Sequence, residues 1–184
     1  MALKTIVVAG TPGAGKSTVL SKVSIPKVKI VNLGDLMLRY TKLSDRDSLR
    51  SLPIKEQIKT RYKAINDLSK KSGIFVVDTH LTVKKNAQYL PGFSTNELKK
   101  LGLLGIIYID AKSEDIIRRR QKDKTRKREQ ESEDEISMQR LANLSIMAAI
   151  STELNVPFFI VSNNEGELEK AAEEASHIIK ELIL

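Results

Sequence analysis

The feature that most constrains this chain is a glycine-rich segment that directly follows a short apolar run near its amino terminus. Residues 6–9 are apolar, and the nine residues after them fit the pattern Gly-x-x-x-x-Gly-Lys-Ser: Gly10, Thr11, Pro12, Gly13, Ala14, Gly15, Lys16, Ser17 and Thr18. Glycine has no Cβ and readily adopts positive φ, so successive backbone N–H groups in such a segment can converge on one anion. Lys16 adds a cation, Ser17 adds a hydroxyl that suits Mg²⁺, and a helix that begins here adds the positive end of its dipole. The segment predicts a loop that holds the phosphates of a nucleotide, and the alternative is a glycine-rich turn between a strand and a helix.

Short apolar runs alternate along the chain with longer segments of helical periodicity. This is the pattern of a parallel sheet that is covered by helices. The expected strands are residues 5–9, 27–32, 74–78, 104–110 and 157–162. The expected helices include residues 53–71, a helix that Ser113 caps, and an amphipathic closing helix at residues 165–184. The predicted fold class is therefore α/β, with a five-stranded parallel sheet between two layers of helices.

Length and composition bound the class of protein. The 184 residues suffice for one substantial core and are few for two domains, so we expect a single domain over residues 1–184. The chain has no Cys and two His, which excludes a disulfide framework and a thiolate zinc site and argues against a histidine metal cluster. We find no signal-peptide pattern and no run of ~18–20 apolar residues. We therefore expect a soluble, cytoplasmic protein without a membrane partner.

The formal net charge of +8 is concentrated in one segment. Between residues 118 and 128, eight basic residues stand against Asp123 alone, and the rest of the chain is close to neutral. Such a run can clamp nucleotide phosphates, form a solvated helix face or follow a nucleic-acid backbone. The acidic residues at 129–135 would repel a long polyanion, and the basic run contains no aromatic residue for base stacking. The phosphate clamp is the favoured interpretation, and nucleic acid is the least favoured.

Four residues outside the glycine-rich segment are candidates for chemistry. Asp78 ends a predicted strand at the sheet edge where α/β proteins bind ligands, and an acid there holds Mg²⁺ or caps a turn. His80 can contact a phosphate or the acceptor, or serve as a structural histidine. Asp35 can cap a helix or act as a base. Arg50 can reach a second phosphate or pair with neighbouring acids.

The abundance of basic side chains bears on the chemical nature of the phosphoryl acceptor. Transfer to a hydroxyl uses a carboxylate base, whereas transfer to a phosphate does not, because the attacking oxygen is already anionic. A phosphate acceptor instead needs cations that bring two polyanions together. The basic run therefore favours a nucleotide phosphate as the acceptor, while Asp35 keeps a hydroxyl acceptor open.

The segment at residues 141–150 is apolar around the whole helical wheel, which is more than one buried face needs. A central position in the core is one explanation. Burial of a second face against another subunit is the other, and the sequence does not separate the two.

Several motifs in order make the chain resemble the archaeal type of adenylate kinase over nearly its whole length. They are the glycine-rich segment at 10–18, Asn-Leu-Gly-Asp-Leu-Met at 32–37, Asp-Arg-Asp at 45–47 with Arg50, Asp-Thr-His at 78–80, Tyr-Leu-Pro-Gly at 89–92 and the basic run at 120–128. The resemblance implies reversible phosphoryl transfer, ATP + AMP to 2 ADP, with Mg²⁺ on a P-loop core. It also implies a helical segment over AMP at about 34–72, a short basic lid over ATP at about 120–133, and assembly as a trimer.

The residues carried over from this resemblance complete the expected site. Residues 10–18 would hold ATP, and Ser17 with Asp78 would hold Mg²⁺. The expected catalytic residues are Lys16, Arg120, Arg126 and Arg128. The expected AMP-binding residues are Asp35, Arg50 and His80.

Two functions of other kinds stay open at this point. One is a kinase of a small metabolite or nucleoside that uses Asp35 as its base. The other is a nucleotide-dependent, RNA-associated ATPase whose basic run contacts RNA. The acceptor separates the three: AMP for an adenylate kinase, a neutral hydroxyl for the second, and RNA-stimulated turnover without an acceptor for the third.

Overall fold

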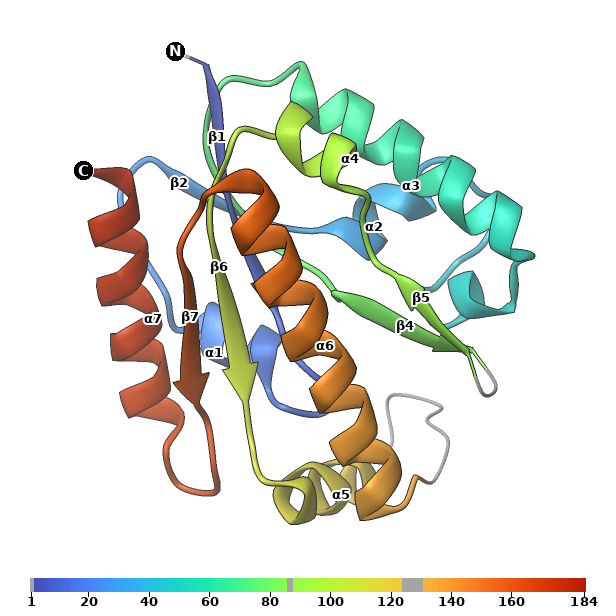
Figure 1. Cartoon of the computed structure of the whole chain (residues 1–184), viewed down its shortest axis with the longest axis vertical. Coiled ribbons are helices and arrows are strands. Elements are labelled where there is room, and N and C mark those ends of the chain that lie inside the picture. The colour runs from blue at the N-terminus through green and yellow to red at the C-terminus, as the bar shows by residue number, and fades with distance from the viewer. Residues whose placement is uncertain (1, 86–87, 124–130) are drawn as a thin grey trace.

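Five parallel strands form the central sheet of the structure, a computed structural model that describes residues 2–85, 88–123 and 131–184 (Figure 1). The strands are β1 (Leu3–Ala9), β2 (Val28–Asn32), β3 (Gly73–Asp78), β6 (Leu103–Asp110) and β7 (Phe158–Ser162), in the order β2-β3-β1-β6-β7. Each neighbouring pair is parallel. The α/β fold class and all five predicted strands are confirmed, with boundaries within two residues of those expected.

Helices cover both faces of this sheet. One face carries α1 (Lys16–Ser21) and α7 (Leu168–Ile183), and the other carries α2 (Leu33–Leu38), α3 (Ile54–Ser69), α4 (Thr95–Lys100) and α6 (Glu133–Leu154) (Figure 1). Successive side chains of a strand point to opposite faces, so Ile6 and Val8 of β1 pack under α1 and α7 while Val7 packs under α3 and α6. Burial on both faces explains why β1 reads as a continuous apolar run.

Two predicted helix caps are wrong in their details. Ser113 is the first residue of α5 (Ser113–Lys122), the cap position belongs to Lys112, and no side chain caps this helix. Asp35 does not cap α2, because Asn32 stands three residues earlier and its Oδ1 accepts the Asp35 N–H at 3.2 Å. Asn32 thus starts the helix directly after β2, and Asp35 becomes an acid of its first turn, where the helix dipole favours a negative charge.

A second, two-stranded sheet was not predicted. It consists of β4 (Thr82–Lys85) and β5 (Gln88–Pro91), which pair antiparallel on the α3 side of the molecule (Figure 1). The short 3₁₀ helix η1 (Ser48–Ser51) is tied to this hairpin, since the Nζ of Lys85 donates to the carbonyl of Leu52 at 2.7 Å. Helix α4 was also missed, although Ser94 and Glu97 form a capping box that the sequence pattern Ser-x-x-Glu could have indicated.

Helix α6 buries only part of its apolar surface. Met147 and Ile150 lie in the core, whereas the side chains of Met138 and Leu141 are more than half exposed, at 56% and 58%. A central position in the core therefore does not explain the apolar residues on its outer face. Neither α6 nor any other helix in the described ranges combines the length and the hydrophobicity that a bilayer crossing requires.

Two of the isoleucines of α3, Ile58 and Ile65, provide a test of which face of this helix holds the fold together. Ile65 is fully buried in the core and Ile58 is 48% exposed. We expect Ile65→Ala to lower the free energy of unfolding by about 3 kcal/mol, because it removes buried methylenes and leaves a cavity. We expect Ile58→Ala to change it by less than about 1 kcal/mol. Urea unfolding measures both, and equal losses would contradict this packing.

Candidate active site

The glycine-rich loop connects the end of β1 to α1 and adopts the backbone that its glycines permit. Gly13 and Gly15 have φ values of 97° and 89°, a region that disfavours residues with a Cβ. Both also lie against side chains: a Cβ at Gly13 would come within 3.2 Å of the Arg120 side chain, and a Cβ at Gly15 would collide with the amide of Asn163. The two glycines therefore allow the loop to turn at positive φ, and they leave room for the side chains of Arg120 and Asn163.

Lys16 opens helix α1 at the end of this loop and is 8% exposed. Its Nζ lies 3.5 Å from the carbonyl oxygen of Gly10, so the aliphatic chain folds back over the loop that it follows. A buried ammonium beside a glycine-rich loop that leads into a helix suits the phosphates of a polyanion.

Ser17 and Asp78 meet where β1 and β3 end. The Oγ of Ser17 donates to Oδ2 of Asp78 at 3.1 Å, and Nδ2 of Asn32 donates to the same oxygen at 2.8 Å. Strand register places Asp78 between Val8 and Asn32, and its side chain is buried. These two oxygen-bearing side chains suit Mg²⁺, a hard cation that binds through one or two protein ligands together with water and substrate phosphates. The described residues contain no cluster of three or more acidic, His or Cys side chains that could hold a metal ion.

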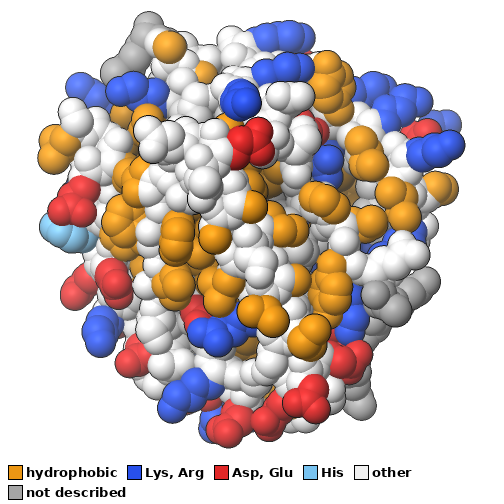
Figure 2. Space-filling model, viewed as in Figure 1, with side chains coloured by type: hydrophobic (Ala, Val, Ile, Leu, Met, Phe, Trp, Pro, Cys, Tyr) orange, Lys and Arg blue, Asp and Glu red, His pale blue; other side chains and the backbone are white. Residues whose placement is uncertain are grey.

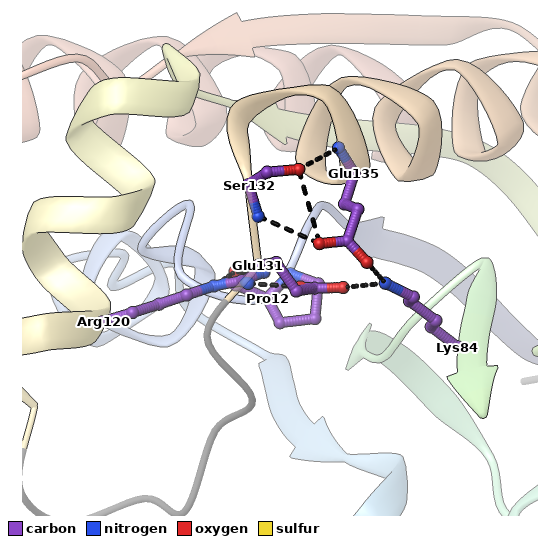
Figure 3. A network of polar contacts seen from close by, with 6 residues as sticks. All are labelled: Pro12, Lys84, Arg120, Glu131, Ser132 and Glu135. Atoms are coloured by element: carbon purple, nitrogen blue, oxygen red, sulfur yellow. Dashed lines mark hydrogen bonds and ion pairs between the residues drawn. The ribbon is translucent and has the colours of Figure 1, made fainter. Parts of the chain in front are cut away.

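Arg120 of α5 reaches the outside of the loop. Its Nε and Nη2 donate to the Pro12 carbonyl at 2.9 and 2.7 Å, and its Nη1 forms an ion pair with Glu131 (Figure 3). The side chains of Arg120 and Glu131 are only 8% and 9% exposed, so this is a buried, charge-assisted contact beside the loop. A sequence-predicted catalytic arginine and the phosphate loop are thus brought together.

Lys84 extends this cluster to the hairpin. Its Nζ lies 2.6 Å from Glu131 and 2.8 Å from Glu135, and Glu135 also caps α6 by accepting the Ser132 N–H (Figure 3). The hydrogen bonds that Lys84 donates to Glu131 and then to Glu135 raise the pKa of Lys84 above its ordinary value. Burial raises the pKa of Glu131, but the hydrogen bonds from Lys84 and Arg120 outweigh it and leave this pKa below the ordinary value. Lys84 and Glu131 are therefore both charged at neutral pH.

A second chain of polar contacts links the same loop to the same hairpin through the core. Tyr108 of β6 accepts from Nδ2 of Asn143 at 3.3 Å, and its hydroxyl lies 2.9 Å from Oγ1 of Thr11. Oδ1 of Asn143 in turn accepts from the hydroxyl of Thr82, the first residue of β4, at 2.7 Å. Burial raises the pKa of Tyr108, which keeps its phenol protonated and able to donate to Thr11.

The predicted acceptor-side residues are less closely gathered. Asp35 lies on the first turn of α2 and pairs with Arg46 at 3.3 Å. His80 follows Asp78 by two residues and is half-buried, with its carbonyl against Gly92. Arg50 lies exposed on η1, and the structure does not bring it to the phosphate loop. Arg126 and Arg128 lie outside the described residues, as do residues 124–130 of the segment expected as a lid.

Sequence reasoning missed Lys84, Glu131, Tyr108 and Asn143. Lys84 and Glu131 carried no motif, and their pairing depends on a hairpin that was not predicted. Tyr108 and Asn143 were hidden in apolar segments, where the signal was a polar side chain at a position that the periodicity assigns to the core. That signal was available, since Asn143 falls within the helix whose apolar character was noted.

The charge state of Glu131 leads to a test. A depressed pKa means that its contribution to stability is complete above the pKa of the unfolded chain and is lost as pH falls through the folded value. We expect Glu131→Gln to lower the free energy of unfolding by about 2 kcal/mol at neutral pH. Between about pH 7 and about pH 3, the wild type should then lose more stability than the variant. Glu133→Gln, an exposed position two residues along, is the matched control, and a wild-type pH dependence in both variants would refute the cluster.

The sequence matches one family model and several proteins of known name. A family model described as an AAA domain matches residues 9–137. A protein from Thermoplasma acidophilum named adenylate kinase is 35% identical over 178 residues, which cover 94% of this chain and 97% of that protein. Another adenylate kinase, from Methanothermobacter thermautotrophicus, is 34% identical over 187 residues, which cover 97% of this chain and 100% of that protein.

Solved structures share the fold. A shikimate kinase from Bacteroides thetaiotaomicron has a TM-score of 0.66 at 12% identity and covers 97% of this chain and 99% of its own. A shikimate kinase from Acinetobacter baumannii has a TM-score of 0.62 at 18% identity, with coverages of 98% and 94%. At these identities the likeness concerns the fold alone. The relatives that are more than 30% identical over nearly the whole length decide the family, and this chain belongs to the adenylate kinases.

Proposed function

We propose that the site described above carries out the adenylate kinase reaction, the reversible Mg²⁺-dependent transfer of a phosphoryl group between ATP and AMP that yields two ADP. The observation that carries the proposal is the convergence of the loop, Lys16 and the Ser17–Asp78 pair at one end of the sheet. This is the edge of an open α/β sheet at which ligands bind. Because these substrates are nucleotides of the cell interior, we also infer a cytoplasmic place of action.

In this proposal the loop and Lys16 hold the donor phosphates. Backbone N–H groups of Gly13 and Gly15 and the Lys16 ammonium bind the phosphate oxygens of ATP, and the interaction of Lys16 strengthens most when negative charge moves onto the transferring group. Ser17 and Asp78 would hold Mg²⁺, which supplies positive charge between the phosphates when it is bound. Asp78 is kept in place for this task by Asn32.

The acceptor side needs no base, because the phosphate of AMP already carries an anionic oxygen. We assign the acceptor to the region between α2, η1 and the β4–β5 hairpin, with Asp35, Arg50 and His80 as its contacts. Arg120 donates to the loop at the Pro12 carbonyl, and its catalytic role stays a prediction from the family resemblance. The catalytic roles of Arg126 and Arg128 stay predictions from the family resemblance.

Lys16→Ala tests the donor side. We expect turnover to fall on the order of 10²–10³-fold, because a cation that meets developing charge is lost. The matched control is Lys22→Ala, at the other end of α1, where the lysine pairs with Glu169 on the surface at 2.6 Å. A coupled assay of ADP formation measures both, and near-wild-type turnover of Lys16→Ala would contradict the assignment of the loop.

The same assay on the unaltered protein tests the acceptor. ADP should form when both MgATP and AMP are present, and omission of AMP should abolish it. Turnover with an unphosphorylated nucleoside or small alcohol in place of AMP would support a hydroxyl kinase instead. Acceptor-free hydrolysis that RNA accelerates would support the RNA-associated alternative.

We also propose that the protein assembles with copies of itself, as a trimer in line with the family resemblance. Apolar side chains gather over α6 and β7 (Figure 2), among them Met138, Leu141, Phe158 and Ile160, which are 41–58% exposed. Contiguous exposed apolar surface of this kind marks an interaction site. A self-association surface accounts for the outer face of α6 that the core leaves uncovered.

Leu141→Glu tests this assembly. A buried, unpaired carboxylate at a subunit contact is strongly unfavourable, so we expect the variant to be monomeric. Light scattering during size-exclusion chromatography should give about three copies per particle for the wild type and one for the variant. Ile58→Glu, at an exposed apolar position on α3, should leave the mass unchanged. An unchanged mass for Leu141→Glu argues against this surface.

A further inference from the structure

The side chain of Asn163 contacts the phosphate loop at Ala14. This residue follows β7, is 2% exposed, and donates through Nδ2 to the Ala14 carbonyl at 2.7 Å. Arg119 of α5 donates to the same carbonyl at 3.3 Å and to the Asn163 carbonyl at 2.9 Å. The backbone N–H of Asn163 is itself bonded to the Asp110 carbonyl at the end of β6 at 2.8 Å. The amide that meets the loop is therefore anchored to two strands of the sheet.

The direction of the Ala14 carbonyl matters because of the planarity of the peptide unit. The carbonyl of Ala14 and the N–H of Gly15 belong to one peptide plane and point in opposite directions. A carbonyl turned towards a bound phosphate would repel it, whereas an N–H group would bind it. Fixing the Ala14 carbonyl against Asn163 on the outside of the loop thus aims the Gly15 N–H to the inside.

Two further features indicate that the contact between Asn163 and the Ala14 carbonyl has a role beyond packing. A Cβ at Gly15 would collide with the Asn163 amide, so the loop is shaped to admit this side chain. Oδ1 of Asn163 is also buried without a hydrogen-bond partner among the described residues. A buried unsatisfied oxygen is unfavourable, and the fold tolerates it at the place where the neighbouring Nδ2 meets the loop.

We propose that Asn163 is a positioning residue of the donor site: by holding the Ala14 carbonyl outside the loop, it aims the Gly15 N–H at the ATP phosphates. Arg119 supports the same carbonyl, and Arg120 does the corresponding work at the Pro12 carbonyl, across Gly13. The inference rests on the proposed donor site. It extends that site to a residue that no motif of the loop includes.

Asn163→Asp is the sharpest variant, because it keeps the shape and replaces the donor with an oxygen that repels the Ala14 carbonyl. We expect MgATP to bind at least tenfold more weakly, as measured by titration calorimetry, and KM for AMP to change less than twofold. Asn163→Ala removes the donor without adding charge and should weaken MgATP binding severalfold, since Arg119 remains. It covers the case in which Asn163→Asp does not fold.

Asn164→Asp is the matched control, with the same change of charge one residue along. Its carboxylate can still accept the Lys112 N–H that Asn164 accepts at 3.1 Å, so MgATP affinity should stay within twofold of the wild type. A lower melting temperature of the Asn163 variants with unchanged MgATP affinity would overturn the proposal and leave a structural role only. Calorimetry needs no turnover, so failure of the wild type to make ADP would count against the proposed function and not against this inference.

Discussion

Phosphate binding by this protein depends on the direction in which the backbone of residues 10–17 presents its dipoles. Phosphate oxygens are bound by N–H groups and repelled by carbonyl oxygens, so a loop of this kind works only if its peptide planes are turned one way. The protein turns them with glycines at positive φ and with side-chain donors on the outward carbonyls, Arg120 on Pro12 and Asn163 on Ala14. Asn163 reaches the loop from the end of β7, and Arg120 reaches it from α5.

Two polar chains then connect this loop to the β4–β5 hairpin. One passes from Pro12 through Arg120 and Glu131 to Lys84, and the other from Thr11 through Tyr108 and Asn143 to Thr82. Both are mostly buried, where an incomplete network would be costly and a complete one fixes a single arrangement. The loop and the hairpin on the proposed acceptor side are therefore joined by two separate chains of polar contacts.

Much of this fold could be predicted from local patterns, because they reflect local physics. Apolar runs located the five strands, and the glycine spacing located the loop and its lysine. The loop motif indicated Ser17 and the end of a predicted strand indicated Asp78, while their pairing was predicted from the family resemblance; the two side chains are in contact in the structure. The hairpin and the Lys84–Glu131–Arg120 cluster could not be predicted in this way, since residues 84 and 131 meet only through the folded chain. The caps of α2 and α5 were predicted at the wrong residues. The backbone geometry puts Asn32 and Lys112 at the two N-cap positions, and the sequence pattern alone does not fix a helix start to one residue.

Whether the loop holds phosphates through its backbone can be measured from the Gly13 and Gly15 amide protons, followed by proton–nitrogen correlation NMR during titration with MgATP. We expect both resonances to move downfield together and to saturate with the same dissociation constant, because each N–H acquires a charged acceptor. Resonances that stay in place while the protein becomes saturated with MgATP would mean that the loop does not hold the phosphates with its backbone.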